Sequence, residues 1–143
     1  MKSLISKSML LFVMAVSLLS FSAKPGGEGF EIYVGNKLMI QRFGGKVNTV
    51  QSLQLGQQTA NENLAIKYHH CGRAGKNRVI TIKDGQNAVL KEFHYADSKD
   101  AASVMILGVK DLVSLRKGTI QSLKLFYASS ELPNGRQLTT INF

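Results

Sequence analysis

Three histidines and a single cysteine are the residues of this chain best suited to chemistry. His69, His70 and Cys71 are consecutive, and His94 follows later in the sequence. Neutral imidazole and thiolate groups are good ligands for zinc or copper. In an extended strand, His69 and Cys71 would point to one side and His70 to the other. A metal site would therefore combine His69 and Cys71 with a third ligand, for which we expect His94, with an acid such as Glu92 as the alternative.

Cys71 could also act as a nucleophile, with His69 as its base and with Arg73 favouring the thiolate. The sequence assigns no Asn or Asp as the orienting third residue of such a set. The simpler interpretation is that His70 continues the buried face of Tyr68, and that Cys71 ends a strand. We expect no enzymatic activity and no cofactor, and we keep the metal or thiol site as an alternative.

Basic residues follow this segment at Arg73, Lys76 and Arg78. The spacing of Gly72, Gly75 and Lys76 does not match the GxxxxGK[ST] loop that binds nucleotides. A glycine-bearing turn with nearby cations can still hold an anion through its backbone N–H groups. We therefore expect Arg73, Lys76 and Arg78 to contact an anionic glycan or a lipid headgroup. An envelope protein is the other candidate partner.

The first residues of the chain have the order of a secretory signal. Lys2 and Lys7 precede a run over residues 9–19 that is apolar apart from Ser17, and the segment 20–23 then contains the small residues Ser20, Ser22 and Ala23. This order predicts a signal peptide over residues 1–22 and a single domain over residues 23–143. The apolar run is shorter than the ~20 residues that a membrane span needs. We expect a periplasmic or secreted protein with no transmembrane span after cleavage.

The composition narrows the choice of partner. The chain of 143 residues has 18 Lys and Arg against nine Asp and Glu, which gives a formal net charge of +9. Such a surplus attracts anions, but export argues against nucleic acid. A single Cys allows no disulfide within the chain. The chain has no Trp, so the aromatic residues available for contact with a sugar are Tyr33, Tyr68 and Tyr95.

Short alternating segments separated by turn residues indicate an all-β domain. Leu64, Ile66 and Tyr68 alternate with more polar residues, as in a half-buried strand. Gly35-Asn36 and Asp84-Gly85 predict hairpin turns. These patterns favour an antiparallel β-sandwich, jelly-roll or Ig-like, with roughly eight strands. A closed barrel is the main alternative.

The later part of the chain combines a strand signal with a helix signal. Residues 104–107 form a continuous apolar run, which predicts a buried strand, and residues 109–116 have helical spacing. Gly118 lies where a helix cap is expected. Pro133-Asn134-Gly135 predicts a turn before a final strand over 136–143. An exposed edge strand of such a domain could add to a partner's sheet, which is a third candidate function in assembly.

Two stretches carry a resemblance to a known group of proteins. One is Tyr68-His69-His70-Cys71-Gly72-Arg73-Ala74-Gly75-Lys76-Asn77-Arg78, continuing through Lys91-Glu92-Phe93, and the other is the segment 126–136. Together they resemble small exported proteins of Bacteroidota that have no known activity. The resemblance covers most of the chain after the signal and implies an envelope location. It implies no site residue.

Overall fold

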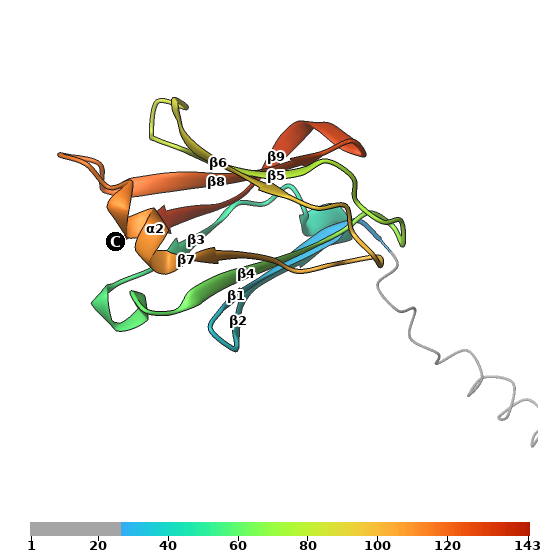
Figure 1. Ribbon diagram of the computed structural model, residues 1–143, viewed down its shortest axis with the longest axis horizontal. Helices are drawn as coiled ribbons and strands as arrows, with labels where there is room; N and C mark the ends of the chain where they lie inside the picture. Colours follow the sequence, from blue (N-terminus) through green and yellow to red (C-terminus); the bar gives the residue numbers. More distant parts are fainter. Residues whose placement is uncertain (1–26) are drawn as a thin grey trace, which may run out of the picture.

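The computed structural model describes residues 27–143, which fold into two β-sheets packed face to face (Figure 1). One sheet has four strands, in the order β2 (Lys37–Phe43), β1 (Gly29–Val34), β4 (Asn63–His69) and β7 (Met105–Gly108). The other has five, in the order β3 (Gln51–Gln54), β9 (Leu132–Asn142), β8 (Ser122–Ser129), β5 (Arg78–Lys83) and β6 (Val89–Tyr95). Residues 27–143 therefore confirm the expected all-β sandwich, with nine strands.

The core lies between the two sheets and follows from alternation along the strands. Successive residues of a strand point to opposite faces, and one residue in two is apolar in the central strands. The buried residues of β1, β4, β5 and β8 include Phe30, Ile32, Leu64, Ile66, Tyr68, Ile80, Ile82, Leu123, Leu125 and Tyr127. The intervening residues lie on the outer face of each sheet, where solvent reaches them.

Turn residues form the hairpin between β1 and β2 and a bulge in β9. Gly35-Asn36 joins β1 to β2 as expected, because Val34 pairs with Lys37 and Gly35 has a φ of +58°. By contrast, the expected turn at residues 133–135 is wrong. The β8–β9 hairpin turns at residues 130–131, and residues 133–135 form a bulge in β9, where Gly135 has a φ of +69°.

One strand pair departs from the expected antiparallel arrangement. β3 runs parallel to β9, with Leu53 opposite Ile141. Short turns dictate antiparallel pairing only between strands that are neighbours in sequence. After β2, the chain crosses from one sheet to the other through the 3-10 helix η2 (Gly44–Lys46). β3 consequently joins the edge of the second sheet, beside a strand far away in sequence.

The segment after residue 104 contains both a strand and a short helix. β7 is an edge strand with one buried side, because Met105 and Leu107 are buried and Ile106 is exposed. The expected helical turn is α2 (Val109–Ser114), but it ends before Gly118, which lies in a later turn. Among residues 27–143, no helix has the length and hydrophobicity needed to cross a membrane.

Candidate functional site

The histidines and the cysteine predicted as metal ligands lie in different places. His69 ends β4 in the four-stranded sheet, whereas His94 lies on β6 at the edge of the other sheet. Cys71 is exposed in a turn, with a φ of +53°. Within residues 27–143, no three His, Cys, Asp or Glu side chains are grouped closely enough to hold a metal ion. The structure thus does not bring His69, Cys71 and His94 together.

A tight turn explains why the strand pattern fails at Cys71. The N–H of Arg73 donates to the carbonyl of His70 at 3.1 Å, and both intervening residues, Cys71 and Gly72, have positive φ. This is the geometry of a type I′ turn. Extended alternation therefore ends at His70, and Cys71 does not share a strand face with His69.

His70 points into the sandwich, as alternation predicts. Its side chain is 4% exposed, and its Nε2 lies 2.8 Å from the hydroxyl of Tyr127 and 3.3 Å from Oγ of Ser129. The rings of Tyr68 and Tyr127 stack with their centroids 4.3 Å apart, and Tyr68 also contacts His70. Burial lowers the pKa of His70 and raises that of Tyr127. The imidazole thus serves as a buried neutral hydrogen-bonding group.

A second network of polar side chains, which includes the buried Tyr68, holds the beginning of β1. The hydroxyl of Tyr68 donates to Oε1 of Glu28 at 2.7 Å, and Arg136 donates to both groups. Burial alone would raise the pKa of Glu28, but the hydrogen bonds from Tyr68 and Arg136 outweigh it and keep this pKa below its ordinary value. The network ties the N-terminal end of the described chain to β4 and β9.

The predicted basic loop is not a single exposed surface. Arg73 and Lys76 are exposed, but Arg78 is only 6% exposed. Its Nε donates to the carbonyl of Ala96 at 2.9 Å, and its Nη1 donates to the carbonyl of Ser103 at 2.6 Å. This corrects our expectation for Arg78, whose inward position at the start of β5 places the guanidinium under the chain that leads to β7.

The backbone donors of the loop are also engaged within the protein. The N–H of Lys76 donates to the carboxylate of Glu131 at 3.0 Å, and the N–H of Asn77 donates to Asp97 at 2.9 Å. These carboxylates occupy the positions in which an anionic ligand would be held. Within residues 71–78, the cations that remain exposed are Arg73 and Lys76.

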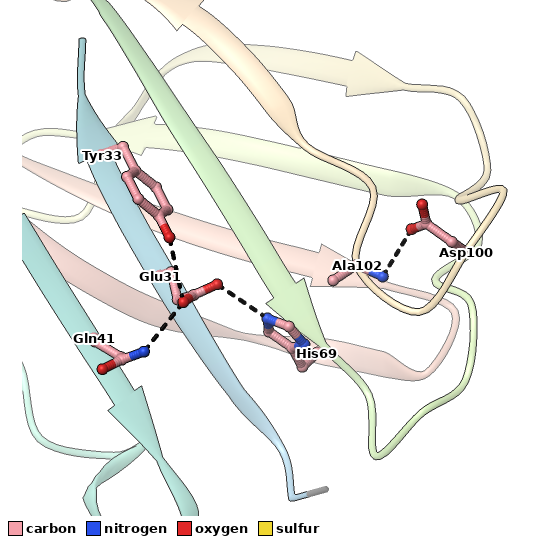
Figure 2. Close-up of polar contacts among 6 residues, drawn as sticks. All are labelled: Glu31, Tyr33, Gln41, His69, Asp100 and Ala102. Carbon is pink, nitrogen blue, oxygen red and sulfur yellow. Dashed lines mark hydrogen bonds and ion pairs between the residues drawn. The ribbon is translucent and has the colours of Figure 1, made fainter. Parts of the chain in front are cut away.

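A polar cluster lies on the outer face of the four-stranded sheet, around the carboxylate of Glu31. Tyr33 and Gln41 donate to Oε1 of Glu31 at 3.3 and 3.1 Å, and Nε2 of His69 lies 3.3 Å from Oε2. Figure 2 shows the three side chains converging on this carboxylate from β1, β2 and β4. We call Glu31, Tyr33, Gln41 and His69 the Glu31 cluster.

An apolar row crosses the same face beside this cluster. Tyr33 pairs with Leu38 of β2 and with Ala65 of β4, and Ala65 pairs with Ile106 of β7. Paired residues of neighbouring strands project from the same side of a sheet. Leu38 is 42% exposed and Ile106 is 52% exposed, while Tyr33 and Ala65 are half-buried. The apolar row thus spans all four strands and is open to solvent.

The outer face of the five-stranded sheet has a different composition. Its paired outward residues include Ser52, Thr81, Lys83, Lys124, Phe126, Gln137 and Thr140. The single aromatic residue of this set, Phe126, is covered by Lys83, whose Nζ lies 4.3 Å from the ring centroid. A face of this kind is the usual solvated side of an antiparallel sheet.

The three tyrosines considered for sugar contact lie in different environments. Tyr68 is buried, and Tyr95 donates to the carbonyl of Ile106 at 2.9 Å, with its pKa raised to about 12 by burial. Tyr33 alone of the three belongs to the apolar row. Alternation in the first hairpin could have indicated that Tyr33 faces outward. That the apolar row extends to Ile106 follows only from the order of the strands in the sheet.

The sequence was compared with protein-family models and with curated proteins. No protein-family model matches it, and no curated protein is similar enough in sequence to count as a match. The arguments for function therefore rest on the geometry of residues 27–143 and on the sequence.

Proposed function

We propose that this protein is an exported, non-enzymatic binding module of the cell envelope. Its contact surface is the outer face of the four-stranded sheet, formed by the apolar row and the Glu31 cluster. The observation that carries the proposal is the apolar row, which is continuous across four strands. Its two ends, Leu38 and Ile106, are exposed, and its two central residues are half-buried. Contiguous apolar surface with a polar rim is a general mark of an interaction site.

The Glu31 cluster supports binding because its side chains are already held in place. Glu31 accepts from Tyr33 and Gln41 and contacts His69, so these groups lose little freedom when a partner arrives. Ordering side chains at an interface costs about 0.5 to 1.5 kcal/mol for each one. A prearranged surface avoids part of that cost.

The location of the protein in the envelope rests on the sequence. Residues 1–26 lie outside the described part of the chain, so the signal peptide and its cleavage near Ser22 remain predictions. The order of charged, apolar and small residues supports export. The surplus of Lys and Arg supports an anionic ligand or partner, with Arg73 and Lys76 as secondary contacts.

Photo-crosslinking in intact cells tests the contact surface. Ala65 on β4 is replaced by the photoreactive residue p-benzoylphenylalanine, and Ala128 on β8 serves as the matched control. Both alanines are half-buried on central strands and point outward, but from opposite sheets. We expect light-dependent adducts at position 65 and none above background at position 128.

Two results would contradict the proposal. Equal adducts at both positions would mean that the protein makes no selective contact through the four-stranded sheet. Adducts at neither position would mean that the outer face stays solvated in the envelope. In both cases, circular dichroism of the purified variants must first show that each one is folded.

A further inference from the structure

We propose that the partner bound by the outer face of the four-stranded sheet is an acidic protein surface. Tyr33 is the central anchor of this contact, and Lys67 is its charge contact. The inference rests on the proposed function and adds the chemical class of the partner.

The shape and chemistry of the face favour a protein over a sugar or a small molecule. Small ligands bind in concave clefts, whereas the apolar row lies across an open sheet. Leu38 and Ile106, at the two ends of the row, are aliphatic and exposed. Aliphatic side chains offer little to sugar hydroxyls, but an apolar centre with a polar rim is the usual anatomy of a protein interface.

The position of Tyr33 fits the role of an anchor. It lies on β1, an inner strand, and has row neighbours on both sides, Leu38 and Ala65. Its hydroxyl is held by Glu31, which fixes the ring on the face (Figure 2). Tyrosines at the centre of interfaces carry a large share of binding energy, because they bury much area with few rotatable bonds.

The charges on the face favour an acidic partner. Lys67 pairs with Glu31 across β1 and β4, and its Nζ lies 5.6 Å from the ring centroid of Tyr33. Within residues 27–143, the ammonium group of Lys67 forms no ion pair with a carboxylate, whereas the Glu31 carboxylate already contacts three side chains. The ammonium group of Lys67 is therefore free to pair with a carboxylate of a partner, whereas the Glu31 carboxylate is already engaged within the protein.

The same charges disfavour a second copy of the chain as the partner. Two copies docked through this face would bring two surplus-positive domains together. Like charges brought together at an interface oppose binding. An acidic surface instead gains attraction from Lys67 at close range and from the net positive charge at long range.

A peptide selection with matched variants tests the inference. A random peptide phage library is selected on the purified chain without residues 1–22, and the enriched peptides are synthesised for titration by fluorescence polarisation. The variants are Tyr33→Ala and Lys67→Glu. The control is Lys83→Glu, since Lys83 also covers an aromatic ring, but on the other outer face.

We expect the enriched peptides to combine Asp or Glu with an aromatic or aliphatic residue. Their affinity should fall at least tenfold with Tyr33→Ala or Lys67→Glu, should fall as salt is added, and should not change with Lys83→Glu. Failure to enrich peptides, peptides without acidic residues, or equal binding to all variants would overturn the inference.

Two further experiments distinguish an acidic protein from other possible ligands of this face, an anionic glycan and a second copy of the chain. Binding of polygalacturonate that depends on Tyr33 would identify an anionic glycan as the ligand. Dimerisation measured by sedimentation, and lost in Tyr33→Ala, would identify a second copy. Each result overturns the acidic protein partner but leaves selective crosslinking at position 65 intact. Loss of that crosslinking would instead defeat the proposed function.

Discussion

His69 and His70 are neighbours in the chain, but they belong to opposite sides of the four-stranded sheet. His70 faces inward, where it is buried against Tyr127, and His69 faces outward, where it contacts Glu31 and is half-buried. Alternation along β4 therefore separates two roles. The inner side holds the two sheets together, and the outer side is available to a partner. Substitutions on the inner side should lower the free energy of unfolding, and substitutions on the outer side should weaken binding to a partner.

The largest effect is expected for Tyr127→Ala on the inner side. Tyr127 is fully buried, stacks on Tyr68 and contacts His70. The variant should lower the free energy of unfolding by about 3 to 5 kcal/mol, measured by urea denaturation. The outer-side counterpart, Tyr33→Ala, should change it by less than about 1 kcal/mol. Similar losses in the two variants would remove the proposed distinction between the sides.

A smaller loss is expected for Gly75→Ala, which tests the packing over His70. A Cβ at position 75 would lie 3.0 Å from the hydroxyl of Tyr127 and 3.3 Å from Cδ2 of His70. Because both rings are packed, the loop would have to shift to avoid these close contacts. We expect the free energy of unfolding to fall by about 1 to 3 kcal/mol. Gly45→Ala is the control, since nothing lies within 4 Å of a Cβ there. An unchanged thermal midpoint in Gly75→Ala would show that the loop does not press on His70.

The pH dependence of stability should distinguish the two histidines. Burial keeps the pKa of His70 below 6.5 in the folded state, so the unfolded chain takes up the proton first as the pH falls. The free energy of unfolding should therefore decrease as the pH drops below 6.5, and should level off once the folded state is protonated too. His70→Gln should abolish this decrease, and His69→Gln should retain it.

Urea denaturation between about pH 5 and 8 measures this effect in the range where histidine titrates. The carboxyls of Glu28 and Glu131 also have lowered pKa values, but their contribution is lost only at pH values below 4.5. An unaltered slope in His70→Gln would mean that another group causes the pH dependence.

The local part of the fold could be predicted from the sequence, and the non-local part could not. The strand over residues 64–68 and the turn at Gly35-Asn36 follow from alternation and from residues that tolerate positive φ. The parallel pairing of β3 with β9 depends on a crossing between sheets that leaves no local signal. The bulge at residues 133–135 has the same residue types as a turn, so its sequence predicted the wrong element.

The candidate site shows the same division. Alternation placed His70 with Tyr68 on the buried face, but it could not show that Cys71 leaves the strand in a left-handed turn. Arg78 was misplaced because basic residues at a strand end usually face solvent. The apolar row needs the registers of β2, β1, β4 and β7 together, and these come from segments far apart in sequence.

Cysteine accessibility in the envelope tests the central claim most directly. In a Cys71→Ser background, Ile106→Cys reports on the four-stranded sheet and Val89→Cys on the five-stranded sheet. The natural side chains have similar exposure, 52% and 55%. For each position, the rate of maleimide labelling in intact cells is divided by the rate in the purified protein. We predict that this ratio is several-fold lower at position 106 than at position 89. Equal ratios at the two positions would contradict a partner on the outer face of the four-stranded sheet.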